Sequence, residues 1–515
     1  MTILDHISLR PFLPVALAVV VGVMAGDALA PTLQSDVLWM ALPTALLGVV
    51  FALYRCPVAQ GIMLLVLSAS IAAASAAISR HGRTLPLPIE DATFSAVVVS
   101  PPERHGKVFR CTLLVVDGPL SGRRIRASFL RTDDDSGLLA LHTGYGVRCT
   151  ATLTAVEELH PDEHFSYVRY CEARGIAATT LILPQRWSHA SVSLRRLSTF
   201  ERCRYGAMML RERLLQRFRE AGGDDYAVVA AMTLGSKSAI SPALRATYSD
   251  AGASHLLALS GLHVGVIGAM LTLLFVGRRR IALGATLSVV AIWCYAVLVG
   301  LSPSVVRAAT IFTLYSLAAL LRRERISINA LAFAATVTLV VSPASLWDVS
   351  FQMSYLAVLA ILLFLRPLSA VIGAEALSHP VVKWAWGIVV VSLSAQIGVA
   401  PVVLYYFGSF PCLFLLTNII AIPLATAIIY LAAMFFLCTP IASLQHCVES
   451  LMIAAARLLN TLLQAIAALP FASIGGIHFS LLQVVLCYML FACIYFLAMY
   501  GRRLARSAQW RKRKV

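Results

Sequence analysis

Residues 255–265 place groups capable of chemistry at the start of a long hydrophobic stretch. The segment carries two imidazoles, His255 and His263, together with the hydroxyl of Ser260 and two glycines. Polar groups at membrane depth cost free energy, so they tend to persist where a function requires them. The segment is therefore the first candidate for a functional site in this chain.

Ser260 and His263 could act together as a nucleophile and its base. Residues three apart on a helix are neighbours, and residues 258–261 resemble the Gly-x-Ser-Gly segment of rhomboid intramembrane proteases. A serine hydrolase is one interpretation, although it also needs an oriented base and an oxyanion hole. A close helix crossing at Gly261 and Gly265 is a second interpretation. The polar wall of a membrane path is a third.

The composition indicates the class of protein in which these groups act. Hydrophobic residues make up 59% of the 515 residues and charged residues only 13%, whereas a soluble protein typically carries about 25% charged residues. The sequence therefore predicts a polytopic α-helical membrane protein. Apolar segments close to the ~20 residues that span a bilayer occur at about 11–30, 37–54, 58–79, 254–276, 281–300, 303–321, 327–342, 348–366, 384–402, 411–438, 445–469 and 480–500.

Residues 85–190 interrupt the apolar segments and carry the signals of a small β-domain. Alternating Val-, Thr- and Phe-rich runs predict strands, and Asp-Gly-Pro and Ser-Gly segments predict turns between them. The predicted strands are 93–100, 108–116, 123–130, 146–154 and 177–183. Such short strands suit a small β-barrel, and an OB-like fold is the leading hypothesis because OB-folds bind single strands along one face.

Residues 191–220 combine apolar residues at helical spacing with many arginines. This pattern is typical of an amphipathic helix on an anionic membrane surface. A solvated helix docked on the rest of the protein explains the pattern equally well. Binding of nucleic acid by the arginines is a third interpretation.

The distribution of arginine and lysine predicts the orientation in the membrane. Basic clusters follow apolar segments at 278–280 and 322–325, and a basic tail occupies 501–515. The positive-inside rule places these clusters in the cytoplasm, which puts both termini inside and the β-domain outside. Segment 445–469 has polar residues on one helical face, so both a crossing and an interfacial position stay open for it.

Eleven cysteines are scattered along the chain and form no Cys-x-x-Cys pair. No zinc or redox motif is indicated, and we expect neither a metal nor a cofactor. Cys111, Cys149 and Cys171 fall in the β-domain, where an oxidising compartment would favour a disulfide. We predict the pair Cys111–Cys149, with Cys171 as the rival partner.

Further polar residues lie within the later apolar segments. Arg307 sits a few residues into a predicted span, where it would face protein or water or reach the outer interface along its aliphatic stem. Asp348 and Gln352 share one helix face. The first suits a helix N-terminus and the second an interhelical hydrogen bond. Asn418 admits the same choice between a packing role and a role in a polar path.

Several blocks resemble the ComEC family, the inner-membrane channels that take up single-stranded DNA in bacterial transformation. The signature Leu259-Ser260-Gly261-Leu262-His263 carries the resemblance. Further matching blocks lie at 165–176, 233–235, 252–257, 300–308 and 342–355. Many family members continue into a C-terminal metallo-β-lactamase-like domain, but this chain has no His-x-His-x-Asp-His cluster. We therefore expect the protein to be no enzyme, and any nuclease to be another polypeptide.

The resemblance implies a channel that translocates single-stranded DNA across the inner membrane into the cytoplasm during natural transformation. A small-solute transporter and an intramembrane serine hydrolase using Ser260 are the alternatives. The implied domains are N-terminal transmembrane helices at 1–84, an extracytoplasmic OB-like domain at 85–190, amphipathic and linking helices at 191–253, the channel core at 254–500 and a basic cytoplasmic tail at 501–515.

The same hypothesis assigns residues to the path of the strand. The expected lining of the path is Ser260, His263, Ser302, Arg307, Asp348, Gln352 and Asn418. The expected external DNA contacts are Arg104, Lys107, Arg110, Arg123, Arg124 and Arg126. Besides single-stranded DNA and membrane lipid, the expected partners are a DNA receptor and a cytoplasmic helicase or nuclease.

Overall fold

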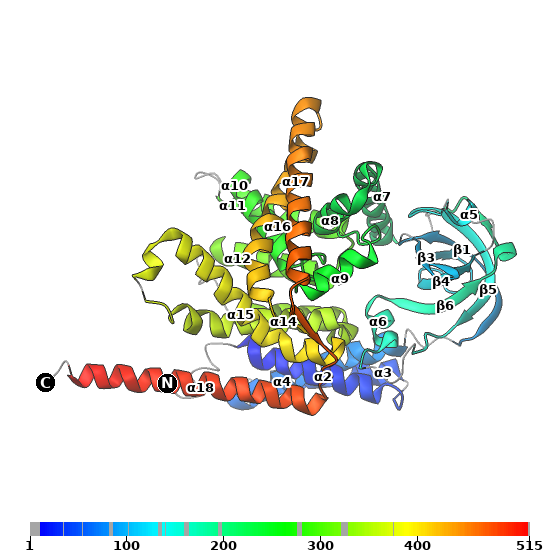
Figure 1. Cartoon of the computed structure of the whole chain (residues 1–515). Coiled ribbons are helices and arrows are strands. Elements are labelled where there is room, and N and C mark those ends of the chain that lie inside the picture. The colour runs from blue at the N-terminus through cyan, green and yellow to red at the C-terminus, as the bar shows by residue number, and fades with distance from the viewer. Residues whose placement is uncertain are drawn as a thin grey trace.

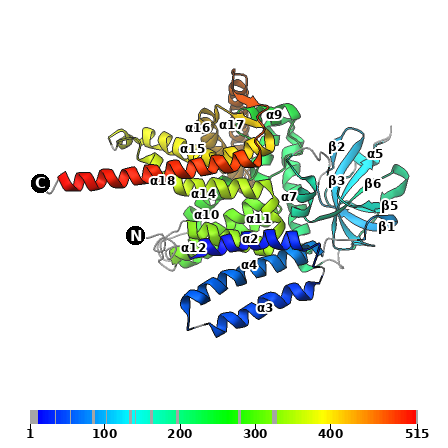
Figure 2. The same ribbon diagram turned by 90° about the horizontal axis from the view of Figure 1, so that it is seen from below.

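A bundle of long helices carries a β-barrel at one end (Figures 1 and 2). This computed structural model describes residues 11–33, 35–53, 55–81, 86–100, 102–131, 136–139, 141–158, 164–193, 198–275, 281–320, 328–373 and 375–512. Among these residues, eight helices are long and apolar enough to cross a membrane, and four shorter apolar helices fill the remaining predicted segments. The predicted polytopic helical protein with a small barrel insert is confirmed.

The N-terminal helices are α2 (Phe12–Leu29), α3 (Asp36–Ala52) and α4 (Pro57–His81). α2 lies directly against α4 because Gly22 and Gly26 have no side chains there. A Cβ at Gly22 would lie 2.1 Å from the carbonyl oxygen of Ala69, and one at Gly26 would lie 2.2 Å from that of Ala73. Glycines four residues apart allow this backbone approach between membrane helices.

The barrel consists of β1 (Ile89–Val98), β3 (Val108–Asp117), β4 (Arg124–Leu130), β5 (Gly146–Thr154) and β6 (Ile176–Ile182). The order β1-β3-β4-β6-β5 closes because β5 pairs with β1, and β4 and β6 are parallel. Two short strands extend it, β2 (Glu103–His105) on β3 and β7 (Trp187–His189) on β5. The turns α5 (Ser136–Leu139) and η1 (Pro184–Arg186) and the helix α6 (Tyr167–Ala173) complete the domain. The barrel is consistent with an OB-like fold.

Alternation along the strands separates the apolar barrel core from its outer face. Phe109 and Leu113 of β3 and Phe129 of β4 are buried in the core, whereas Arg110 and Arg126 lie on the opposite face. The strands predicted from this alternation match the observed ones because side chains on a strand point alternately to its two faces.

Cys111 and Cys149 both lie in the barrel core, and both thiols are free in this structure. Burial raises the pKa of each thiol to about 12, so both stay protonated at neutral pH. Cys171 of α6 is likewise buried and free. The disulfide between Cys111 and Cys149 therefore stays a prediction.

Three helices connect the barrel to the remaining bundle, α7 (Thr199–Ala221), α8 (Gly223–Leu234) and α9 (Pro242–Asp250). Leu215 and Phe218 of α7 are buried. Glu201 of α7 pairs with Arg124 of β4 at 3.5 Å, and the Nε of Arg211 donates to the carbonyl of Leu234 at 2.7 Å. Of the three interpretations for this segment, these contacts favour the helix docked on the rest of the protein.

The second half of the chain is helical. Its elements are α10 (Gly261–Phe275), α11 (Ile281–Leu298), α12 (Pro303–Leu320), α13 (Ile328–Val341), η3 (Pro343–Trp347), α14 (Val349–Ser369), η4 (Ala376–Ser378), α15 (Pro380–Phe407) and α16 (Phe414–Leu437). The helix predicted from residue 254 begins only at Gly261. Residues 251–260 form turns instead, because Gly252 takes a positive φ of 78° and ends α9.

The helices α16 and α17 (Ala442–Ala467) form a hairpin whose two ends meet. β8 (Ser409–Pro411) precedes α16 and pairs with β9 (Ser473–Gly475), which follows α17. The hairpin therefore starts and ends on the same side and contributes no net crossing. α17 runs crosswise to α4, α14 and α18 (Leu481–Lys512) (Figures 1 and 2), so these helices cannot all lie along the membrane normal.

The polar face predicted on segment 445–469 packs against the linking helices. Arg457 pairs with Asp225 of α8 at 3.2 Å, and the Nδ2 of Asn460 donates to the same carboxylate at 2.8 Å. The hydroxyl of Tyr248 of α9 donates to Asn460 at 2.8 Å. These polar groups therefore hold α17 to α8 and α9. The basic residues on which the orientation was predicted, at 278–280 and 322–325, and the side chains of the tail from 502 onward lie outside the described residues.

Candidate functional site

Five helices of the second half contact one another in a closed circuit. α10 contacts α12, α12 contacts α14, α14 contacts α15, α15 contacts α16, and α16 returns to α10. We call this group the five-helix ring. Each of its helices, or the residue directly before it, contributes a polar side chain that is buried: His263, Arg307, Asp348, Ser394 and Asn418.

The pair Ser260–His263 opens α10 of the ring. The Nδ1 of His263 accepts the backbone N–H of Ser260 at 3.2 Å and lies 3.0 Å from its Oγ. A side chain at the third helical position that accepts the N–H of the capping residue is the arrangement of a capping box, here with histidine in the usual place of Glu or Gln. The pair therefore starts the helix.

The same geometry weakens the hydrolase interpretation of Ser260. Because Nδ1 accepts an N–H, the proton of the neutral imidazole resides on Nε2. That Nε2 is buried and has no partner among the described residues, so no third group there orients the base as in a catalytic triad. The backbone of Leu256 acts on this imidazole, and its Nε2–H is a buried donor for which no side-chain acceptor lies among the described residues.

His255 lies beside this pair in a different setting. His255 is exposed. It lies close enough to His263 for the two imidazoles to interact electrostatically. Ser254 and Gly261 of the same segment are also exposed. The signature segment is thus partly exposed, whereas His263 is buried.

Arg307 is the buried cation of the ring, only 3% exposed. Its guanidinium lies over the ring of Tyr355 at 5.1 Å from the centroid, and the charge of Asp348 acts on it. Its Nη1 has no partner among the described residues. Burial excludes the position at the outer interface, so Arg307 faces the protein interior.

The backbone before α12 takes an unusual course. Gly300 and Leu301 have positive φ values of 92° and 57°, and a branched residue such as leucine adopts this region only when its surroundings hold it there. The turn delivers the hydroxyl of Ser302, which is buried without a partner among the described residues. A strained backbone beside unpaired polar groups favours a functional role for this block.

Asp348 and Gln352 have structural partners. The Oδ1 of Asp348 accepts the N–H of Ser350 at 3.1 Å, so it caps α14. The Nε2 of Gln352 donates to the carbonyl of Leu346 at 3.0 Å, and its Oε1 accepts the hydroxyl of Tyr406 at 3.1 Å. Gln352 therefore links α14 to α15, the interhelical role that the sequence left open.

Only one end of the Asn418 side-chain amide has a hydrogen-bond partner among the described residues. Its Nδ2 donates to the Oγ of Ser392 on α15 at 3.1 Å, whereas its Oδ1 has no partner among the described residues. Ser394 and Thr417, which the sequence did not single out, are also buried, and their hydroxyls have no hydrogen-bond partner among the described residues. A lone hydroxyl in an apolar run gives a weak signal, because it commonly bonds a carbonyl of its own helix.

Buried polar atoms without a partner among the described residues thus gather on the ring and the loops that enter it. Seven of the ten such atoms in the described residues lie there: His263 Nε2, Ser302 Oγ, Arg307 Nη1, Trp386 Nε1, Ser394 Oγ, Thr417 Oγ1 and Asn418 Oδ1. The other three, Arg126 Nε, Thr143 Oγ1 and Ser288 Oγ, belong to the barrel and to α11. In folded proteins the large majority of buried polar atoms have a partner, in the protein or in ordered water. A group of such atoms indicates bound water or a polar ligand at this place.

Basic residues of the barrel form the second part of the candidate site. Arg110, Arg124 and Arg126 share the outer face of β3 and β4, but Arg124 is paired with Glu201. Arg126 lies over the ring of Tyr167 of α6 at 6.0 Å. Arg104, Lys107 and Arg123 are exposed on β2 and in turns, whereas Arg110, Arg124 and Arg126 are half-buried.

The basic face continues from the barrel toward the linking helices. Arg174 follows α6 and lies over the ring of Tyr170 at 3.6 Å. Desolvation lowers the pKa of Lys237, and the charges of Arg245 and Arg174 lower it further, which places the three cations near one another. We call Arg110, Arg126, Arg174, Lys237 and Arg245 the basic strip.

Residues 232–500 match the model of the family described as Competence protein. The chain belongs to the competence protein family. This match includes all five helices of the ring, whereas the barrel precedes it. The basic strip therefore begins outside the matched region at Arg110 and ends inside it at Arg245.

Two curated relatives are similar to this competence protein. ComE operon protein 3 of Bacillus subtilis (strain 168) is 27% identical over 56% of this chain and 35% of the relative. An uncharacterized protein of Aquifex aeolicus (strain VF5) is 30% identical over 44% of this chain and 51% of the relative. The chain thus spans about a third and a half of these relatives. No solved structure gives a significant match. The predicted resemblance to the ComEC family is confirmed.

The polar groups of the ring differ in kind from a cluster of metal ligands. Within the ranges that the structure describes, no group of three or more His, Cys, Asp or Glu side chains could hold a metal ion. The arrangement offers hydrogen-bond donors, hydroxyls and cations, which suit an anionic or hydrated ligand.

Proposed function

We propose that this competence protein is an inner-membrane channel that passes single-stranded DNA into the cytoplasm during natural transformation. The observation that carries the proposal is the set of unpartnered polar atoms on the five-helix ring. A DNA strand carries one negative charge per nucleotide and cannot cross hydrocarbon unaided. It needs a wet wall of weak, repeated contacts, because one tight site would trap it.

The chemistry of the ring fits such a wall. His263, Ser302, Ser394 and Asn418 supply neutral donors and acceptors, and Arg307 supplies a single buried cation. A guanidinium binds phosphate in a planar, bidentate manner, but one cation does not form a tight binding ring. These groups would exchange their water for the phosphates and bases of a passing strand.

The basic strip would guide the strand from the barrel to the ring. It places Arg126 over Tyr167 and Arg174 over Tyr170. Proteins that hold single strands without sequence preference combine cationic grooves with aromatic rings on which bases stack. The strip ends at Arg245 of α9, and the signature segment follows directly after that helix.

The proposal includes an orientation. α2 begins and α18 ends at the end of the bundle away from the barrel (Figure 1), which suits both termini in the cytoplasm and the barrel outside. α17 lies crosswise to α4, α14 and α18 (Figure 1), as an interfacial helix would. Because β8 pairs with β9, the hairpin of α16 and α17 starts and ends on the same side, so it does not alter the orientation of the helices that follow. Reporter fusions at Asp134 and Val515 should occupy opposite compartments, and equal compartments would contradict this orientation.

Transport by the purified full-length chain in proteoliposomes tests the function. We expect a labelled single-stranded oligonucleotide to become nuclease-resistant inside the vesicles, while a double-stranded oligonucleotide and small neutral solutes do not. Uptake of small solutes without DNA would favour a transporter. Covalent labelling of Ser260 by a serine-directed probe would favour a hydrolase.

A further inference from the structure

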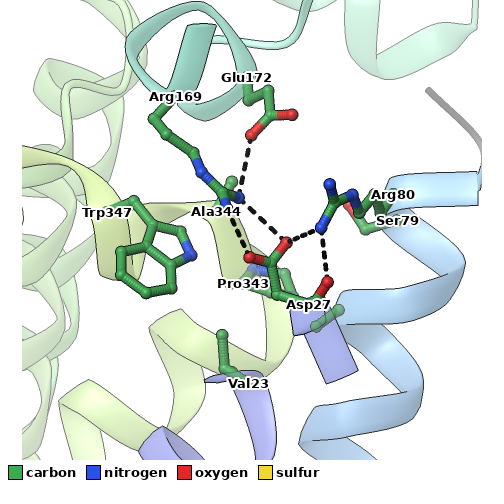
Figure 3. A pocket seen from close by; sticks show the side chains of 10 residues that line it. Val23, Asp27, Ser79, Arg80, Arg169, Glu172, Pro343, Ala344 and Trp347 are labelled. Atoms are coloured by element: carbon green, nitrogen blue, oxygen red, sulfur yellow. Dashed lines mark hydrogen bonds and ion pairs between the residues drawn. The ribbon is translucent and has the colours of Figure 1, made fainter. Parts of the chain in front are cut away.

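A cluster of charged residues joins the barrel to the N-terminal helices (Figure 3). Its members are Asp27 of α2, Arg80 of α4, Arg169 and Glu172 of α6, and Trp347 of η3. We call them the Asp27 cluster. They come from three regions that are far apart in sequence, namely the first membrane helices, the barrel domain and the start of α14.

Asp27 is the centre of the cluster. Its two carboxylate oxygens accept hydrogen bonds from the two terminal nitrogens of Arg169, at 2.7 and 3.0 Å. Arg80 reaches the same carboxylate at 3.2 Å, while Arg169 also contacts Glu172 at 3.4 Å. A two-pronged bond between arginine and carboxylate is strong and fixes the direction of both groups.

The cluster is closely packed around this carboxylate. The side chain of Asp27 is only 14% exposed, and the cavity between the members holds about 20 Å³, room for about one water molecule. The guanidinium of Arg169 lies over the ring of Trp347 at 5.0 Å. Burial lowers the pKa of Arg169, but its bonds to Asp27 and the charges of Asp27 and Glu172 outweigh burial and raise it.

Helix α6 also contacts residues of the basic strip. Tyr167 at its start lies under Arg126 of the barrel, and the charges of Arg126 and Arg174 both act on Cys171. α6 thus connects the Asp27 cluster with the basic strip. A change in the direction of α6 would displace Tyr167 and Arg174 relative to Lys237.

We propose that Asp27 is a positioning residue that holds the barrel, through α6, in the orientation in which the basic strip is continuous with the five-helix ring. The proposal rests on the proposed function, since it assigns Asp27 a role in guiding the strand. Asp27 touches no part of the strip, so its effect passes through Arg169.

Hydrogen exchange of the full-length chain in lipid nanodiscs measures the docking without DNA. Asp27→Asn leaves Arg80 and Arg169 facing each other without the shared anion. We expect amides of residues 164–182 to exchange roughly tenfold faster, because loss of a charge-assisted bond exposes the segment to local opening. Uptake of single-stranded DNA should fall by a similar factor.

Two variants serve as controls. Asp27→Glu keeps the negative charge and should change exchange and uptake by less than about twofold. Asp36→Asn removes a carboxylate of α3 that pairs with His81 at 2.8 Å and lies near the same end of the N-terminal helices, and it should leave residues 164–182 unchanged.

Three outcomes would overturn the proposal. The first is unchanged exchange in folded Asp27→Asn protein. The second is faster exchange with normal uptake, since docking would then not guide the strand. The third is lower uptake in Asp27→Glu as well as Asp27→Asn, without any change in exchange. Failure of the wild-type chain to take up DNA would refute the proposed function, while the exchange measurement would still decide whether Asp27 docks the barrel.

Discussion

In the barrel, charged side chains lie on the outer face around an apolar interior, whereas in the five-helix ring the polar groups are the buried ones. Arg110 and Arg126 project from strands whose other face carries Phe109 and Phe129. Arg307 and His263 are instead 3% and 0% exposed. The two regions therefore offer a strand different environments, one a half-buried cationic face and the other a set of buried polar groups.

This difference shows where affinity and passage would arise. Exposed cations attract phosphate through screened, long-range forces, so their effect depends on salt. Buried groups act at short range, and each one left without water or ligand costs free energy. We therefore expect variants of the ring to alter passage strongly and variants of the barrel to alter mainly binding.

Arg307→Ala should have the largest effect. It removes the buried cation of the ring, and we expect uptake of single-stranded DNA to fall roughly a hundredfold at normal protein abundance, because charge stabilisation is strong away from water. Arg307→Lys should retain part of the activity, since it keeps the charge but loses the planar contact with Tyr355. Arg366→Ala, at an exposed residue near the end of α14, is the control.

Normal uptake by Arg307→Ala, His263→Ala and Gln352→Ala, each at wild-type abundance, would refute the polar wall. These residues would then be packing groups. Transformation frequency of a strain that depends on this chain provides the measurement, with immunoblotting of membranes to determine abundance.

His263→Gln should have the next largest effect and separates two roles of one side chain. Glutamine can still accept the N–H of Ser260 and start α10, so abundance should not change. Glutamine does not hold an N–H at the fixed position of the buried Nε2–H of the imidazole ring. Uptake should therefore fall roughly tenfold, the loss expected for about 1.4 kcal/mol. Normal uptake would show that the imidazole serves only to begin the helix. Ser260→Ala is the companion variant and should reduce uptake by less than about threefold.

The double variant Arg110→Ala, Arg126→Ala should affect binding more than passage. For single strands the logarithm of the binding constant falls with the logarithm of salt by about 0.7 per phosphate contact. Loss of two contacts should therefore lower this slope by about 1.4. Fluorescence anisotropy with a labelled oligonucleotide over a salt series measures it. Arg148→Ala, an exposed arginine of β5, should leave the slope unchanged, and an equal loss there would indicate a diffuse attraction.

The smallest effect concerns the barrel core. As free thiols with a pKa near 12, Cys111 and Cys149 should resist alkylation at pH 8 in the folded protein, while exposed Cys203 reacts. Mass mapping after alkylation, with and without denaturant, measures this. A linked peptide pair from non-reduced protein would instead establish the disulfide predicted from the sequence.

Local patterns predicted the elements closely. Strand β5 was expected at 146–154 and is found at Gly146–Thr154, because alternating burial repeats along the whole strand. Helix α10 was expected from residue 254 but begins at Gly261. The composition of residues 254–260 resembles that of the helix that follows, whereas their backbone is not helical. Gly252, with its positive φ, ends α9, and the cap at Ser260 begins α10, so residues 253–259 belong to neither helix.

Contacts between segments far apart in the chain could not be predicted from the sequence. Asp27 and Arg169 lie 142 positions apart, and nothing in either local pattern links them. The pairing of β8 with β9 was equally hidden, because each strand has only three residues. Charge counts gave the six external basic residues, but the pairing of Arg124 with Glu201 depends on how α7 docks.

The contact of Gly22 and Gly26 with α4 bears on how the chain is assembled during synthesis. α2, α3 and α4 are the first described helices to emerge, and α2 and α4 can join through backbone contact before any later segment exists. Asp27 follows Gly26 directly, and Arg80 lies in the last turn of α4. Asp27 and Arg80 would therefore be in place to receive Arg169 before the barrel leaves the ribosome, whereas Trp347 of η3 would join the cluster later.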